Sequence, residues 1–151
     1  MKLLEIFFWS MVPIIEQKGA IIRGIITYNL NPQTVFFVSL IGSLIPVPFI
    51  LIFFNRIYKW MQNYKTLNGI NNYINKKLHK NCSKFLKYKE IALVLFIAIP
   101  LPTTGLWTGS AIAAFLKFNF KKSIFCAIIG GVISAFLITV SSVVFPTFLG
   151  M

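Results

Sequence analysis

Acidic residues are scarce in this chain of 151 residues, which has 3 Asp and Glu against 15 Lys and Arg and a net charge of +12. Charged residues of either sign make up only 12% of the chain, against roughly 25% in an ordinary soluble domain. Because 57% of the residues are hydrophobic, the composition predicts an integral membrane protein. The cations cluster between apolar segments instead of covering a polar surface, so we expect no nucleic-acid partner.

Residues that hold metal ions or form disulfide frameworks are equally rare. Cys82 and Cys126 are 44 residues apart without a CxxC pattern, and His79 is the single histidine. One histidine cannot hold a metal ion, and two such cysteines form no recognisable site. We find no nucleophile motif and no pair of acids, so we expect no metal, no cofactor and no enzymatic activity.

Two uncharged segments are long enough to cross a membrane. Residues 33–54 and 123–149 comprise 22 and 27 residues. A bilayer core of about 30 Å needs roughly 20 residues of helix. Two further apolar segments, 3–28 and 91–116, are interrupted by Pro and Gly. Each of these either crosses once or folds back at its centre into two short arms.

The two halves of the chain resemble each other at an offset of 88 residues. At this offset, small residues coincide: Ser39 with Ala127, Gly42 with Gly130, and Ser43 with Gly131. Such stripes let membrane helices approach closely. With small gaps, Pro13 matches Pro100, and Gly19 matches Gly105. We therefore predict a single membrane domain, 1–151, with repeats at about 3–55 and 89–149 and a basic connector at about 56–88.

The distribution of Lys and Arg favours hairpins over single crossings. If each repeat is a re-entrant helical hairpin plus one spanning helix, it crosses once, and the second repeat is inverted relative to the first. Nine Lys or Arg between 56 and 89 then share one face with Lys117, Lys121 and Lys122. The positive-inside rule predicts that this face is cytoplasmic, in the plasma membrane of a bacterium or archaeon. For the first segment, a full span stays open as an alternative.

The connector carries apolar residues at helical spacing. They are Leu67, Ile70, Ile74, Leu78, Cys82 and Phe85, with Lys and Asn between them. This pattern predicts an amphipathic cytoplasmic helix lying against an anionic leaflet, with a plain solvated linker as the alternative. The predicted fold class is thus an all-α integral membrane protein with an inverted repeat of two units, joined by a basic amphipathic helix.

The stretch "PLPTTG" at 100–105 breaks the backbone inside an apolar segment. Pro100 and Pro102 disrupt a helix, and Gly105 allows close approach. The hydroxyls of Thr103 and Thr104 are candidates to cap the arm that begins near Gly105. The N-terminus of that arm would direct free N–H groups at the membrane centre, which suits an anion. A helix merely kinked by proline is the alternative.

Three charged residues, Glu16, Lys18 and Arg23, lie in the first broken segment. Ionisable groups within a membrane are costly and are by default functional hypotheses. Glu16 and Arg23 are seven residues apart, so they share one face of a helix with Gly19 or flank the tip of a hairpin. Either arrangement permits a neutralising pair between them, and a solvated interfacial loop that holds all three is the alternative.

The two tips carry a resemblance. "PIIEQKGAII" and "IPLPTTGLWTGSAIAAFLKF" resemble the small multi-drug export protein family, a relative of the DedA (VTT-type) superfamily. Glu16 matches the family pattern, whereas Lys18 stands where the family has Arg, and Ile22 replaces a Pro. The resemblance implies facing re-entrant hairpins, and DedA relatives are linked to the translocation of lipid carriers.

We expect a transporter or lipid translocase that binds an amphiphile or lipid phosphate between the two tips and is coupled to protons through Glu16. The expected binding residues are Glu16, Lys18, Gly19, Arg23, Pro100, Pro102, Thr103, Thr104, Gly105 and Trp107. An exporter of cationic drugs, as the resembled family's name suggests, is one alternative, and a membrane scaffold without transport is another. A homo-oligomer is compatible with the small-residue stripes.

Overall fold

The computed structural model describes residues 1–62, 82–101 and 104–148, and this part of the chain consists of helices and the short loops between them, with no strand. Its elements are α1 (Lys2–Met11), α2 (Glu16–Ile22), the π-helical turn η1 (Arg23–Thr27), α3 (Pro32–Leu44), α4 (Pro46–Gln62), α6 (Cys82–Ala98), α7 (Leu106–Phe115) and α8 (Phe120–Phe148). The all-helical prediction is confirmed for these residues. The apolar pattern predicted for the connector falls mostly on 63–81, outside the described residues, and stays a prediction.

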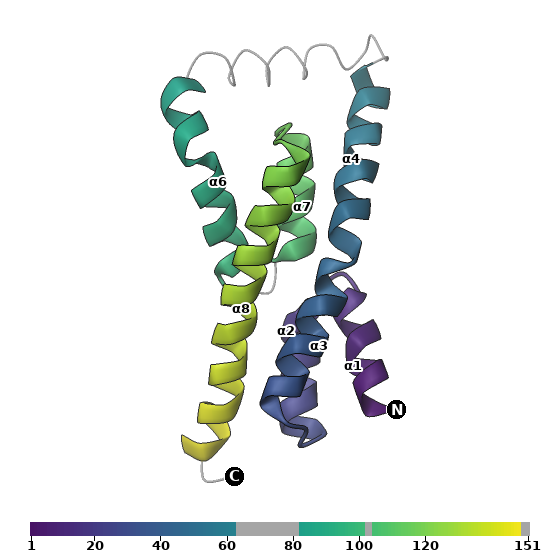
Figure 1. Cartoon of the computed structure of the whole chain (residues 1–151), viewed down its shortest axis with the longest axis vertical. Helices are drawn as coiled ribbons and strands as arrows, with labels where there is room; N and C mark the ends of the chain where they lie inside the picture. Colours follow the sequence, from purple (N-terminus) through teal and green to yellow (C-terminus); the bar gives the residue numbers. More distant parts are fainter. Residues whose placement is uncertain (63–81, 102–103, 149–151) are drawn as a thin grey trace.

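Two stretches are long and apolar enough to cross a membrane, as predicted. They are Pro32–Ile57, with 26 residues, and Phe120–Pro146, with 27. The first consists of α3 and the first twelve residues of α4, and the two helices follow each other closely because Ile45 keeps a helical backbone between Leu44 and Pro46. Figure 1 shows that α3 with α4, and α8, run through the length of the molecule.

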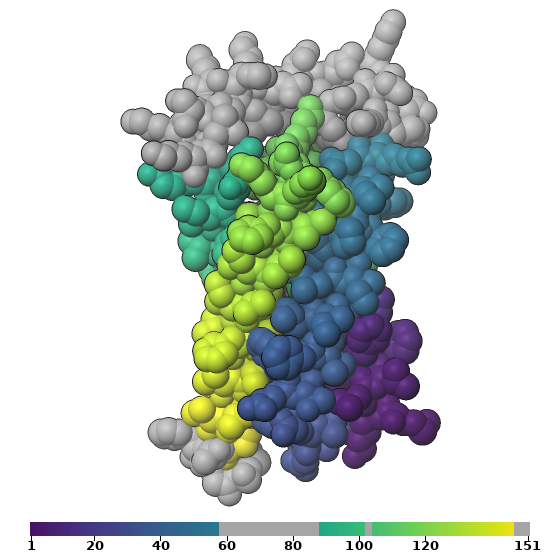
Figure 2. Space-filling model, viewed as in Figure 1, coloured from purple at the N-terminus to yellow at the C-terminus, as the bar shows by residue number. Residues whose placement is uncertain are grey.

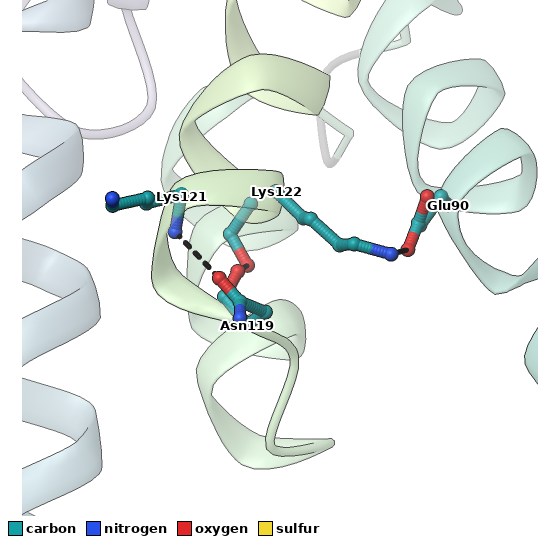
Figure 3. Close-up of polar contacts among 5 residues, drawn as sticks. Glu90, Asn119, Lys121 and Lys122 are labelled. Atoms are coloured by element: carbon teal, nitrogen blue, oxygen red, sulfur yellow. Dashed lines mark hydrogen bonds and ion pairs between the residues drawn. The ribbon is translucent and has the colours of Figure 1, made fainter.

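Each long helix begins at an asparagine cap. The side chain of Asn31 accepts a hydrogen bond from the N–H of Gln33 at 2.9 Å, and that of Asn119 accepts one from Lys121 at 3.0 Å (Figure 3). Such caps satisfy N–H groups that have no partner within the helix. The two asparagines are 88 residues apart, the same offset that aligns the small residues.

The two broken segments each form a pair of short helices. Helices α1 and α2 pack against each other and against α3, whereas α6 and α7 pack against each other and against α8. Figure 1 shows α1 and α2 in one half of the molecule and α6 and α7 in the other, with both breaks near the middle. The returning helices cross over, because α2 also packs against α8 and α7 packs against α4.

Glycines on the long helices allow this close packing. A Cβ at Gly42 would lie 2.6 Å from the carbonyl oxygen of Phe7 in α1, and a Cβ at Gly130 would lie 3.0 Å from that of Val94 in α6. These two glycines coincide in the predicted repeat. Gly42 packs against α1, and Gly130 packs against α6, the first helix of the second broken segment.

One detail of the predicted alignment is wrong. Gly19 and Gly109 are each the fourth residue of a returning helix, α2 and α7, whereas Gly105 precedes α7. Gly19 therefore corresponds to Gly109 and not to Gly105. The physical reason is that the break before α7 contains more residues than the break before α2, so an alignment on glycine alone shifts the register.

The outer surface of the long helices is apolar. Phenylalanines that are 60% to 67% exposed lie on both of them: Phe37, Phe49, Phe53, Phe125, Phe136 and Phe145. A soluble protein rarely exposes so much contiguous apolar surface, whereas a lipid environment accepts it. Figure 2 shows one such face, where α8 lies beside α3 and α4.

The lysines at the start of α8 and the N-terminus lie toward opposite ends of the molecule. Figure 1 places the start of α8 and the end of α4 toward one end, and the N-terminus and the end of α8 toward the other. Near the start of α8, the ammonium of Lys122 lies 2.8 Å from the carboxylate of Glu90 on α6 (Figure 3). Lys117, Lys121 and Lys122 therefore lie at the end of the molecule where α4 leaves for the connector.

Candidate functional site

The two helix breaks contact each other directly. The N-terminal residue of α2, Glu16, has a side chain that accepts a hydrogen bond from the backbone N–H of Trp107 at 2.9 Å. These residues are 91 positions apart in sequence, and Glu16 is only 6% exposed. The carboxylate thus bridges the two halves of the chain at the point where both backbones are interrupted.

Glu16 acts as the cap of α7. Gly105 occupies the N-cap position and offers no side chain, so the N–H groups at the start of α7 need an external acceptor. A carboxylate is well suited, because the hydrogen bond is charge-assisted and the helix N-terminus is electropositive. A Cβ at Gly105 would lie 1.9 Å from Oε2 of Glu16, so only glycine leaves room for this carboxylate.

The predicted cap by Thr104 is wrong. The Thr104 hydroxyl donates to the carbonyl of Ile99 at 2.5 Å and accepts from the N–H of Leu101 at 3.2 Å, so it closes the loop after α6. The loop needs these bonds because its own backbone leaves helical geometry there. Thr103 and Pro102 lie outside the described residues.

Lys18 binds the carbonyl groups of the loop between α6 and α7, whereas Glu16 binds an N–H group at the start of α7. Its ammonium donates to the carbonyl oxygens of Leu101 and Thr104. These carbonyls follow the C-terminus of α6, which is the electronegative end of that helix. Glu16 and Lys18 therefore place a negative charge at the start of α7 and a positive charge beyond the end of α6. Pro100 lies in the same loop, where its missing N–H leaves one fewer donor to satisfy.

Gln17, which the sequence analysis did not single out, ties the first break to both long helices. Its amide nitrogen donates to the carbonyl of Gly131 on α8 at 3.1 Å, and its amide oxygen accepts from the hydroxyl of Ser43 on α3 at 3.1 Å. The side chain is 1% exposed. The only available signal was an uncharged polar residue between two charged ones in an apolar segment.

The turn that presents Glu16 is strained. Ile14 and Glu16 have φ angles of 82° and 47°, in the left-handed region that side-chain-bearing residues avoid. A β-branched residue such as Ile14 is especially unfavourable there, and it is 88% exposed, so no packing compensates for it locally. Local strain of this kind persists where the surrounding contacts enforce it.

We call the contact of Glu16 and Lys18 with the loop after α6 and the start of α7 the junction. Arg23 lies outside this junction, and the predicted pair with Glu16 is wrong. Its guanidinium lies 3.3 Å from Glu5 and 4.7 Å from the ring of Trp9, and its Nε donates to Tyr28 at 3.1 Å. An offset of seven positions separates Arg23 from Glu16 by about 10 Å along the helix axis. Arg23 lies instead near the outer end of α1, where Glu5 is closer.

Several buried polar atoms near the junction have no partner. They are the indole nitrogen of Trp107 and the hydroxyls of Ser39, Ser110 and Ser134. By contrast, the hydroxyls of Ser10 and Ser123 donate to carbonyls of their own chain segment. Such groups cost free energy unless water or a ligand satisfies them.

These features define a helical membrane protein in which two broken helices meet between two long apolar ones. A family model described as "Putative small multi-drug export protein" matches residues 16–138, from Glu16 at the first break to Ile138 in α8. The chain therefore belongs to the small multi-drug export family. No curated protein and no solved structure matches the chain.

Proposed function

We propose that the protein transports an amphiphile or a lipid phosphate through the junction of the two helix breaks. The observation that carries this proposal is the meeting of Glu16 and Lys18 with the interrupted backbone between α6 and α7. Backbone breaks at membrane depth are tolerated only where they are buried in protein or line a cavity. Charged groups at such a depth indicate a substrate or proton pathway.

The contacts of Gln17 support a location near the membrane centre. Gln17 bonds to Ser43 and to Gly131, each the twelfth residue of its apolar stretch when counted from Pro32 and from Phe120. Since these stretches have 26 and 27 residues, the junction lies close to the middle of both. In this proposal, the pairs α1–α2 and α6–α7 are re-entrant hairpins that enter from opposite faces.

An inverted repeat accounts for the paired features of the two halves. The matching asparagine caps, the two glycine contacts and the crossed packing of α2 and α7 are what such a repeat would produce. Transporters of this architecture alternate access by moving one repeat against the other. The relationship to the DedA superfamily stays a prediction.

The substrate class follows from the groups that the junction offers. Glu16 and Lys18 compensate each other, and Arg23 is elsewhere, so the junction has no excess charge among the described residues. The indole N–H of Trp107 and the hydroxyl of Ser110 are available donors, which suit the oxygens of a lipid phosphate. Glu16 is the acidic residue at the junction and serves as the proton-coupling group in this proposal.

A cationic drug is the second candidate substrate, and the family description favours it. In that case the carboxylate of Glu16 would bind the cation directly. The basic end of the molecule faces the cytoplasm of a bacterium or archaeon in our proposal, near an anionic leaflet, because positive residues are retained on that side.

Proteoliposomes test these functions. The measurement is the movement of a fluorescent phospholipid and, separately, of a lipophilic cation, each with and without a pH gradient. We expect gradient-dependent movement of one class, which Glu16→Gln uncouples from the gradient. Arg23→Gln serves as the matched control, because Arg23 lies outside the junction. No movement of either probe by the folded wild-type protein would favour a membrane scaffold.

A further inference from the structure

We propose that Glu16 is a proton-released latch, whose carboxylate closes the junction by capping α7 and whose protonation lets α2 separate from the start of α7. This inference rests on the proposed function in treating the junction as the transport route. It adds that the described structure is the closed state and names the contact that must break.

The cap has the properties of a reversible contact. It comes from the opposite half of the chain, so breaking it leaves the helical hydrogen bonds of α2 and of α7 intact. Gly105 provides the space for the carboxylate and adds no contact of its own. The left-handed backbone at Ile14 and at Glu16 stores strain that is relieved when Glu16 is released.

The charge of Glu16 decides the strength of the cap. A carboxylate accepts hydrogen bonds from N–H groups about twice as strongly as a neutral acceptor, and it interacts with the helix dipole. Protonation removes both advantages in one step.

The groups that face Glu16 are few. Among the described residues, Lys18 is the charged group that acts on its carboxylate. The neighbouring residues on the other elements are Trp107 and Gly105 at the start of α7, Leu101 and Thr104 in the loop, and Ser43 and Gly131 on the long helices, none of which ionises in this range. The opening of the latch by protonation therefore depends on Glu16 itself, and Lys18 is the charged neighbour that acts on it among the described residues.

Cysteine accessibility tests the latch. Ser110, one turn inside α7, is 3% exposed and its hydroxyl has no partner, so Ser110→Cys is a conservative reporter. The variant is made with Cys82→Ser and Cys126→Ser in the full chain, purified and reconstituted, and labelled with a water-soluble thiosulfonate. The labelling rate of this reporter protein is compared with that of the same protein carrying Glu16→Gln at the same pH, so that the intrinsic reactivity of the thiol cancels.

We expect Glu16→Gln to accelerate labelling by about tenfold near pH 8, and the two rates to converge toward pH 5, because a neutral cap is weaker than a charged one by roughly 1–1.5 kcal/mol. Native Cys126, 4% exposed on α8, is the control in a Cys82→Ser background and should label equally slowly with either residue at position 16. Equal rates for the Ser110→Cys reporter near pH 8 would overturn the latch.

A second variant separates the latch from a folding defect. Gly105→Ala displaces the carboxylate sterically and leaves its charge, so it should accelerate labelling at every pH. Gly24→Ala is its match, because a Cβ there would lie 2.7 Å from the side chain of Val35 and 2.8 Å from that of Ile6, so it introduces a similar clash outside the junction and should not change the rate. If labelling behaves as expected while no probe moves in proteoliposomes, the latch stands and the transport function fails. Movement of a probe with unchanged labelling overturns the latch alone.

Discussion

Replacing Gly105 with alanine should destabilise the protein through one identifiable contact. The added Cβ would lie 1.9 Å from Oε2 and 2.7 Å from the carboxyl carbon of Glu16, so the carboxylate must leave its position. The loss is one charge-assisted hydrogen bond to a backbone N–H, which contributes about 1.5–3 kcal/mol. We therefore expect the free energy of unfolding to fall by that amount.

A double-mutant cycle isolates this contact. If the cost of Gly105→Ala comes from displacing the carboxylate, it should nearly vanish in a Glu16→Ala background, because alanine leaves the space empty. The coupling free energy between the two sites should then be about 1.5–3 kcal/mol. The assay is equilibrium unfolding in mixed micelles, with Gly131→Ala as the control for a glycine in ordinary van der Waals contact. Additive costs at Gly105 and Glu16 would refute the assignment of the cap.

Three further predictions concern topology and the first break. With Cys126 replaced, a membrane-impermeant maleimide on intact cells should miss Cys82 and should label Asn31→Cys in a cysteine-free background; strong labelling of Cys82 would reverse the orientation. Ile14→Gly should stabilise the fold by up to about 1 kcal/mol, because glycine accepts the left-handed backbone, and a loss of stability would contradict the strain. Gln17→Leu should lower the free energy of unfolding by about 1–2 kcal/mol through its lost hydrogen bonds, and an unchanged value would show that they contribute nothing net.

The long helices and the positions of the breaks could be predicted from the sequence because they depend on local properties. An uncharged run of more than 20 residues forms a spanning helix whatever its neighbours, and "PLPTTG" interrupts a helix through its missing N–H groups. The stripes of small residues in α3 and α8 predicted that other helices pack closely against these positions. The contacts of Gly42 with α1 and of Gly130 with α6 agree with that prediction.

The partners within the junction could not be predicted, because they depend on the tertiary fold. The cap of α7 comes from Glu16, 91 residues before Trp107, whereas the sequence offered Thr104 as the local candidate. Arg23 was paired with Glu16 on helical spacing, but Glu5 is nearer once α1 folds back along α2. Spacing rules identify neighbours on one helix and are silent about a second helix packed against it.

The charges at the junction are best explained by the break itself. An interrupted helix leaves N–H groups on one side and carbonyl groups on the other without partners, and in lipid no water replaces them. Glu16 accepts a hydrogen bond from the N–H of Trp107, and Lys18 donates to the carbonyls of Leu101 and Thr104, so two residues of α2 that are two positions apart bond on both sides of the break between α6 and α7. A substrate that reaches this junction therefore meets occupied positions. In the transport function that we propose, an anion displaces Glu16 from the N–H of Trp107, and a cation that binds to the carboxylate of Glu16 draws it away from the same N–H. In either case, the proposed binding is coupled to the separation of α2 from α7, which is the kind of movement that alternating access requires.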